Sequence, residues 1–204
     1  QPQCHMIQSF KSMVPVVDET AYVHPMATII GHVTIGKNCY IGPGAVLRGD
    51  WGKIEVSNGC NIQENCVVHM FPGTTVRLEE GAHVGHGAIV HGARLGRQCM
   101  IGMNAVIMDD VVVGEGCIVG ALSFLKAQSQ WEDRTIIAGN PAKVIGEVSD
   151  DMLAHKVEGT GLYQGLPADF HSSLRECEPL RAEPLDRPSE FPDFETWQQR
   201  RKRK

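Results

Sequence analysis

An aliphatic side chain recurs every six residues through much of this chain, and no other sequence feature restricts the possible folds so strongly. The recurring residues are Val23, Ile29, Ile35, Ile41 and Leu47, then Val56, Ile62 and Val68, and finally Ile89, Leu95, Ile101, Ile107, Val113 and Val119. A period of six is neither the 3.6 residues of an amphipathic helix nor the two residues of a strand. It is typical of a solenoid in which each hexapeptide supplies one short strand and one corner, and three hexapeptides complete a turn.

The interior of such a triangular coil has room for one aliphatic and one small side chain in each hexapeptide. Glycine often follows the aliphatic residue and permits a tight corner. The fourth residue after the aliphatic position is usually small, as at Ala45, Ala93, Ala105, Cys39, Cys60, Cys66, Cys99 and Cys117. We therefore expect these five cysteines to pack inward as small hydrophobes. The other two of the seven cysteines, Cys4 and Cys177, lie outside the repeats.

The repeats predict an all-β fold, a parallel β-helix, and hexapeptide repeats of this kind resemble the left-handed β-helix family. Composition agrees with this fold, because 22 glycines accompany only 6% aromatic residues. Beyond the repeats we expect a C-terminal α-helical extension that begins at Ser149, an N-cap followed by two acidic residues. Several glycines and Pro167 favour two short helices over one long helix. The helix face expected to lie on the coil consists of Leu162, Leu166, Phe170 and Leu174.

These patterns divide the chain into four segments. We expect an N-terminal segment at residues 1–13, the β-helix at 14–146, C-terminal helices at 147–180 and an extended or disordered tail at 181–204. The tail is dominated by prolines and charges, which favour an extended chain. Residues 1–5 are expected to precede a native start near Met6 or Met13.

Charge and hydropathy exclude two classes of partner. No apolar run approaches the roughly 18 residues that a membrane span needs, which argues against an integral membrane protein. A net charge of −5 argues against nucleic-acid binding, although residues 200–204 are all basic. No secretory signal is visible, so a cytoplasmic location with reduced thiols is expected.

Four of the nine histidines lie within residues 69–91, and three of them stand out: His69, His86 and His91. His69 directly follows an aliphatic repeat residue, and the other two each lie two residues past an aliphatic residue. His69 and His91 are separated by 22 residues, and a small loop at 70–75 explains the excess over the roughly 18 residues of one coil turn. The two side chains should therefore stack on one edge, roughly 5 Å apart. That separation suits two ligands of one zinc ion.

His86 precedes His91 by five residues, so it lies on a neighbouring side of the triangle and cannot reach the same metal within one chain. In a trimer, His86 could face the His69 and His91 pair of the adjacent subunit. Three histidines with an open fourth position form a catalytic type of zinc site. The spacing leaves an alternative open, in which the three histidines lie on the surface and share no metal ion.

Five motifs, in order along the chain, resemble those of the γ-class carbonic anhydrase family. They are Arg48-Gly49-Asp50, Asn61-Ile62-Gln63, His69, the segment 86–91 and Gly102-Met103-Asn104. The resemblance covers roughly residues 14–146. Three further segments, 21–25, 69–72 and 148–180, resemble a bacterial subgroup that contains PaaY of phenylacetate degradation and CaiE of the carnitine operon. By these motifs the PaaY branch is the nearer.

The resemblance implies a homotrimer with a metal site between adjacent subunits. The implied ligands of Zn²⁺, or of Fe²⁺ or Co²⁺, are His69, His86 and His91. The implied polar pair that orients the metal-bound water is Gln63 and Asn61. The implied ion pair at the subunit interface is Arg48 and Asp50. Weaker candidates near the site are Asn104, Phe124 and Phe71.

The family archetype carries a glutamate beside its Arg-Gly-Asp-type motif and another on the loop after the first ligand. This chain has Trp51 and an acid-free loop at 70–75 instead. Because fast CO₂ hydration needs rapid proton transfer, we favour a metal-dependent CoA thioesterase of the PaaY type, linked to phenylacetate or other aromatic degradation. A γ-type carbonic anhydrase acting on CO₂ or bicarbonate is the alternative. A hexapeptide acyltransferase with one histidine as general base, or a non-catalytic trimer, is the second alternative.

Overall fold

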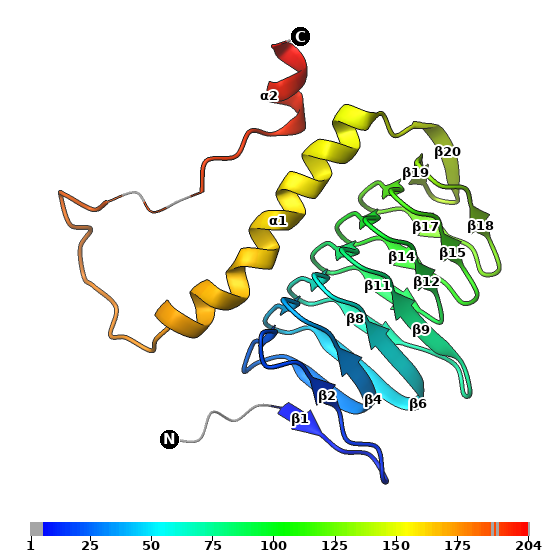
Figure 1. The fold of residues 1–204 in the computed structure, drawn as a ribbon, viewed down its shortest axis with the longest axis horizontal. Coiled ribbons are helices and arrows are strands. Elements are labelled where there is room, and N and C mark those ends of the chain that lie inside the picture. The colour runs from blue at the N-terminus through cyan, green and yellow to red at the C-terminus, as the bar shows by residue number, and fades with distance from the viewer. Residues whose placement is uncertain (1–5, 189, 191, 204) are drawn as a thin grey trace.

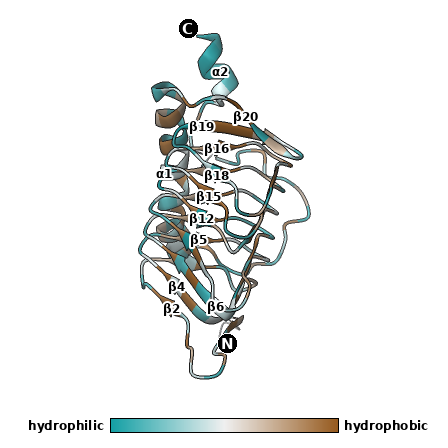
Figure 2. Ribbon diagram, turned by 90° about the vertical axis from the view of Figure 1, so that its right-hand side faces the viewer, coloured by the Kyte–Doolittle hydropathy of each residue, from teal (hydrophilic) through white to brown (hydrophobic). Residues whose placement is uncertain are grey.

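The computed structural model describes residues 6–188, 190 and 192–203. Within this part of the chain, short parallel strands stack into a solenoid along which α1 runs diagonally (Figure 1). The fold is the parallel β-helix that the six-residue period predicts, with the left hand that the family resemblance implies. Hydrophobic residues recur along the stacked strands, whereas the C-terminal helix is hydrophilic (Figure 2).

The strands form three faces of a triangular coil. The first face contains β3 (Tyr22–Val23), β5 (Tyr40–Ile41), β7 (Asn61–Ile62), β10 (His83–Val84), β13 (Met100–Ile101), β16 (Ile118–Val119) and β19 (Thr135–Gly139). This sheet ends with β20 (Ala142–Glu147), which pairs antiparallel with β19 and closes the coil. The turn between these two strands therefore ends the coil.

The second face carries the strands that matter for the candidate site. It contains β1 (Met6–Gln8), the first halves of β4 (Thr28–Ile35) and β6 (Val46–Val56), and then β8 (Val67–His69), β11 (Ile89–His91), β14 (Val106–Ile107) and β17 (Phe124–Leu125). Because β1 pairs in parallel with β4, the coil within the described residues begins at Met6, ahead of the expected start at residue 14. Residues 1–5 lie outside the described residues.

The third face continues from the bent strands β4 and β6. It contains β2 (Val16–Val17), the second halves of β4 and β6, β9 (Thr75–Leu78), β12 (Arg94–Leu95), β15 (Val112–Val113) and β18 (Gln130–Trp131). The register between β4 and β6 shifts between Gly31 and Val33, where the two strands pass from one face to the next.

The interior has the composition that the repeat predicts. Aliphatic side chains such as Leu47 and Ile101 have no exposed surface. All five repeat cysteines are buried and free, as expected for packing residues. Four of these thiols, those of Cys39, Cys60, Cys66 and Cys117, donate to backbone carbonyls of the next coil turn, for example from Cys66 Sγ to Gly85 O at 3.1 Å. These contacts satisfy the thiol without any need for a disulfide partner.

The C-terminal extension corrects one prediction. It forms a single helix, α1 (Asp150–Ser173), in place of two short ones, with Ser149 as the expected N-cap. Its packing face includes Lys156, Thr160, Tyr163 and Pro167, which are buried or half-buried, whereas Leu162 and Leu174 of the predicted face are exposed.

Contacts with the coil explain why the glycines and the proline do not break α1. Phe170 stacks on Tyr22 and Tyr40 of the first face, with ring centroids 4.9 and 5.6 Å away. Lys156 Nζ donates to Gly81 O and to Gln98 Oε1. Such tertiary contacts outweigh a helix penalty of about 1 kcal/mol for each glycine.

The tail is mostly irregular, as predicted, apart from the short helix α2 (Trp197–Lys202), which sequence reasoning missed. Thr196 and Gln199 form a reciprocal capping box at its start. In the described part of the chain, neither helix has the length and apolar character required to cross a membrane.

Candidate metal centre

The second face has two edges, because each of its short strands follows one turn and ends at the next. Glu64 and His86 lie in the turns that precede β8 and β11. His69 and His91 are the last residues of the same two strands. We call the edge with Glu64 and His86 the single-histidine edge, and the edge with His69 and His91 the paired-histidine edge. The structure therefore separates His86 from the other two histidines within one chain, as the spacing predicts.

The paired-histidine edge brings His69 and His91 side by side. Strands β8 and β11 pair in a register that aligns the two residues, and their ring centroids are 5.3 Å apart. The predicted stacking is confirmed, and its basis is the loop between β8 and β9, which absorbs the extra residues of this coil turn. Met70 anchors that loop in the core with no exposed surface.

His69 is held by the Arg48 and Asp50 pair. The two side chains form a salt bridge of 3.6 Å. Arg48 Nη2 lies 3.3 Å from His69 Nδ1, and Asp50 Oδ1 lies 3.1 Å from His69 Nε2. Burial lowers the pKa of His69, and the neighbouring Asp50 opposes that shift only in part. The imidazole is therefore neutral at pH 7, which is the state that binds metals.

A carboxylate orients His91, and sequence reasoning did not identify it. Asp109 Oδ1 accepts from His91 Nδ1 at 2.6 Å. This contact places the ring proton on Nδ1 and leaves Nε2 available as a ligand atom, which is the usual arrangement of metal-binding histidines. The separation along the chain could have identified Asp109, because it follows His91 by 18 residues, which is one turn of the coil.

A carboxylate also contacts the histidine of the single-histidine edge. Glu64 Oε2 contacts His86 Nδ1, and Tyr40 Oη donates to Glu64 Oε1 at 2.9 Å. Burial is the main cause that raises the pKa of Tyr40, and the bond to Glu64 adds to it. The Tyr40 phenol therefore stays protonated at neutral pH and donates its proton to the hydrogen bond with Glu64. Glu64 precedes His86 by the same 22 residues that separate His69 from His91.

The predicted polar pair lies next to Glu64, beneath α1. Asn61 is fully buried and Gln63 nearly so. The Gln63 amide donates to Asn61 Oδ1 at 2.9 Å and lies 2.7 Å from Nε2 of His83, which packs on Tyr163 of α1. Burial lowers the pKa of His83 to about 3, so this ring is neutral. The role of the pair in orienting a metal-bound water stays a prediction.

The three weaker candidates fall at three different places. Asn104 lies in the turn after β13, and its backbone N–H donates to His86 O at 2.9 Å. Phe124 lies on β17, two strands beyond His91 on the second face. Phe71 packs edge-on against His91 with ring centroids 5.2 Å apart. Only Phe71 touches one of the predicted ligands through its side chain.

The donor set fits a metal that is shared between chains. Among the described residues, no three histidine, cysteine or acidic side chains are arranged to hold a metal within one chain. His86 and His91 each have Nδ1 engaged by a carboxylate and Nε2 free of any such bond. His69 would have to exchange its Asp50 contact at Nε2 for the metal. Three imidazole ligands of this kind suit zinc, iron or cobalt.

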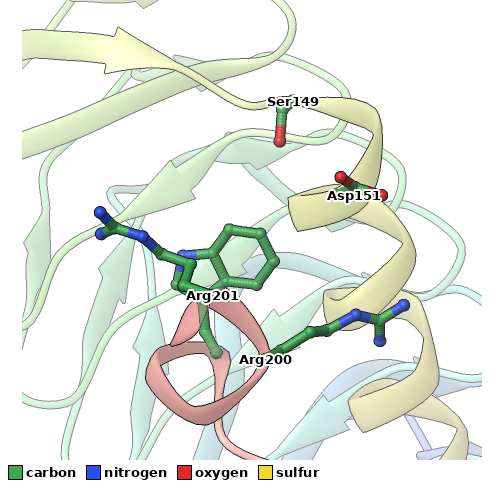
Figure 3. Close-up of a pocket in the computed structure, with 5 residues that line it drawn as sticks. Ser149, Asp151, Arg200 and Arg201 are labelled. Atoms are coloured by element: carbon green, nitrogen blue, oxygen red, sulfur yellow. The ribbon is translucent and has the colours of Figure 1, made fainter. Parts of the chain in front are cut away.

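A separate cavity of about 280 Å³ lies between the start of α1 and α2 (Figure 3). Its lining residues are Ser149, Asp151, Trp197, Arg200 and Arg201. None of the predicted site residues lines this cavity, so it forms no part of the candidate metal centre.

Comparison with known proteins defines the class and then the family. The model for "Bacterial transferase hexapeptide (six repeats)" matches residues 15–49 and 92–127. Carnitine operon protein CaiE of Escherichia coli K12 is 47% identical over 180 residues, which cover 88% of this chain and 92% of that protein. The protein is therefore a hexapeptide-repeat protein. Within that class the chain belongs to the family of CaiE.

Solved structures share the fold. A Bacillus cereus protein named as a candidate acetyltransferase matches with a TM-score of 0.81 at 28% identity, covering 83% of this chain and 98% of that one. A hexapeptide transferase family protein of Anaplasma phagocytophilum matches with a TM-score of 0.77 at 34% identity, covering 80% and 96%. The expectation that PaaY is the nearer branch stays a prediction.

Proposed function

We propose that the protein is a metal-dependent hydrolase of acyl-CoA thioesters whose active site lies between subunits of a homotrimer. The observation that carries this proposal is the separation of the histidines. One edge of the second face presents His69 and His91, and the other presents His86 with its Nδ1 bound to Glu64. Each edge offers histidine nitrogen atoms as possible ligands, and among the described residues neither edge provides three ligands.

The second face between these edges is suited to subunit packing. Its outward side chains form a stripe of apolar residues: Val46, Val67, Ile89, Val106 and Phe124. Val67 and Ile89, at the level of the histidines, are 38% and 39% exposed in the single chain. A cyclic arrangement that buries such stripes would set the single-histidine edge of one copy against the paired-histidine edge of the next.

The residues of this chain then have separate tasks. Asp109 and Glu64 hold the protons of His91 and His86 on Nδ1, which fixes the ligand atoms. Arg48 and Asp50 hold the His69 ring between them. When bound by three imidazoles, zinc supplies a nucleophilic hydroxide at neutral pH, because the metal lowers the pKa of water to about 7.

A thioester is favoured over CO₂ by what surrounds the histidine pair. Trp51 and Phe71 flank His69 and His91, and no acidic side chain stands on the loop from Met70 to Thr74 to accept a proton. Rapid CO₂ hydration would require such a group, whereas thioester hydrolysis does not depend on one. Acyl-CoA substrates from phenylacetate or other aromatic degradation, and a cytoplasmic location, are part of this proposal.

Reversible CO₂ hydration by a γ-type carbonic anhydrase is the first competing function, since it would use the same three histidines. An acyltransferase is a further candidate, because solved structures similar to this one are named as transferases. Transfer by a single histidine acting as general base needs no metal. A non-catalytic trimer would keep the assembly without turnover.

The test is hydrolysis of acyl-CoA by protein that has been stripped with a chelator and then reloaded with zinc. We expect thioester cleavage that requires zinc and is lost in His69→Ala and His86→Ala. Activity that survives chelation would favour the acyltransferase. Fast CO₂ hydration without thioester cleavage would favour the carbonic anhydrase, and neither activity would favour the non-catalytic trimer.

A further inference from the structure

We propose that Trp51 and Phe71 form a binding site for the acyl group of the substrate, and that this site prefers an aryl acyl group to a saturated one. The inference rests on the proposed function, because it assigns the substrate portion that would lie beside the histidine pair. It also makes a statement about binding that can be measured without any turnover.

Four rings contact one another in succession at the paired-histidine edge. The Trp51 and His69 centroids are 5.3 Å apart, and so are those of His69 and His91. The His91 and Phe71 centroids follow at 5.2 Å, with the rings nearly perpendicular. Each of the two predicted ligands is therefore in contact with one aromatic side chain, His69 with Trp51 and His91 with Phe71. A group bound against either aromatic side chain lies next to the metal position.

Both aromatic side chains are exposed although their backbone is fixed. Trp51 is 52% exposed and Phe71 is 55% exposed. The amide of Gly73 donates to Trp51 O at 2.8 Å, which ties the loop that carries Phe71 to the strand that carries Trp51. Thr74 forms a turn with Phe71, because the backbone N–H and the hydroxyl of Thr74 both donate to Phe71 O. Exposed apolar rings on such a pinned backbone are ready to bind a ligand at little cost in ordering.

Arg48 further restricts the indole. Its guanidinium carbon lies 5.8 Å from the Trp51 ring centroid, within the range of a cation–π contact. The same Arg48 side chain contacts His69 and forms a salt bridge with Asp50. The orientation of Trp51 is thus coupled to that of a predicted metal ligand.

The chemistry of these rings indicates the class of acyl group. Aromatic pairs in stacked or edge-to-face arrangements gain about 0.5–1.5 kcal/mol beyond the burial of equal area, which is roughly a two- to tenfold preference. A saturated ring of the same size would gain only the burial. A substrate as small as CO₂ would leave both side chains without a role in binding.

The kinetic test compares phenylacetyl-CoA with cyclohexylacetyl-CoA in the zinc-loaded protein. The two acyl groups have the same carbon skeleton, and a methylene insulates each carbonyl from the ring. We expect kcat/KM to favour the phenyl substrate by about two- to tenfold. Trp51→Ala and Phe71→Ala should each lower that ratio, whereas Trp51→Phe should retain much of it. Ile145→Ala, which removes an exposed apolar side chain of β20, is the matched control and should leave the ratio unchanged.

A binding measurement separates this inference from the proposed function. Calorimetric titration with phenylacetate and with cyclohexylacetate needs no hydrolysis. If no thioester is cleaved but phenylacetate binds more tightly, and Trp51→Ala removes the difference, the aromatic site stands and the proposed function fails. A wild type that shows no preference for the phenyl compound in either measurement would overturn the inference. It would also be overturned if Trp51→Ala dissociated the assembly and left the ratio unchanged, since the ring would then belong to a subunit interface.

Discussion

The interior of the coil and its edges differ in how closely each residue is specified. Inside, every hexapeptide offers equivalent positions, so Cys66 and Ala105 fill the same small site and both are buried. At the edges, Arg48, Gln63 and His69 replace the usual turn glycine, and each contacts a particular partner about one coil turn away. Residues at equivalent interior positions can therefore replace one another, whereas each edge residue has its own partner. A fold held by a repeated interior can therefore accept a site on its edge without losing stability.

The largest effect that this contrast predicts is at the paired-histidine edge. His91→Ala should lose tight zinc binding and lower thioesterase activity by about a thousandfold or more, since a catalytic metal contributes several kcal/mol. The free energy of unfolding of the metal-free protein should change little, because His91 is only half-buried. Zinc content by atomic absorption and unfolding in urea measure the two quantities. His32→Ala is the control, and equal zinc content in both variants would refute the assignment.

The interior should give the opposite result. Ile101→Ala removes a side chain with no exposed surface, and we expect the free energy of unfolding to fall by about 2–5 kcal/mol. Each molecule that remains folded should still bind zinc with wild-type affinity. Urea unfolding and zinc titration at one fixed protein concentration test this pair of outcomes. A loss of zinc affinity as large as that of His91→Ala would show that interior and edge are not separable.

The carboxylates behind the histidines should have smaller effects. Asp109→Ala and Glu64→Ala should each weaken zinc binding by about 10- to 100-fold, because each removes the group that orients a ligand. Asp109→Asn and Glu64→Gln keep an acceptor for Nδ1 and should weaken it less. Competition with a chromophoric chelator gives the affinities. Asp110→Ala, at the neighbouring position, is the control, and a loss equal to that of Asp109→Ala would contradict the specific role.

The smallest effect should come from the interior small position. Cys66→Ala introduces a residue that serves elsewhere in the coil and should cost less than about 1.5 kcal/mol. Burial raises the pKa of Cys66 to about 11. In the unfolded chain the thiol ionises at its ordinary value of 9.0, so Cys66 lowers stability as the pH rises from about 9 to 11. Urea unfolding across this range should show a shallower decline for Cys66→Ala, and an identical decline would contradict the role of the thiol.

Most of the fold could be predicted from the sequence because the signal is repeated many times. Each hexapeptide imposes the same demand, so a break such as the loop after His69 does not obscure the period. The single helix α1 could not be predicted, because its continuity depends on contacts of Phe170 and Lys156 with distant coil turns. Local glycine and proline preferences are weak compared with such packing.

The candidate site was predictable where the coil geometry alone decides, as for the stacking of His69 and His91. The supporting residues Glu64, Asp109 and His83 were missed. Their contacts span 18 to 22 residues, so a search at one coil turn from each histidine would have found them. The two histidines that would share a metal with His86 cannot be found by such a search. Under the proposed assembly they belong to another copy of the chain.

The most direct test of the shared site mixes two inactive variants. Trimers of His86→Ala lack the ligand of one edge, and trimers of His91→Ala lack a ligand of the other. When the two variants are unfolded and refolded together in equal amounts, about a quarter of the interfaces should combine an intact His86 with an intact His69 and His91 pair. We predict that zinc binding and thioesterase activity return to about a quarter of the wild-type level, with neither variant active alone. Mixed trimers that bind no more zinc than their parents would contradict a site built from two subunits.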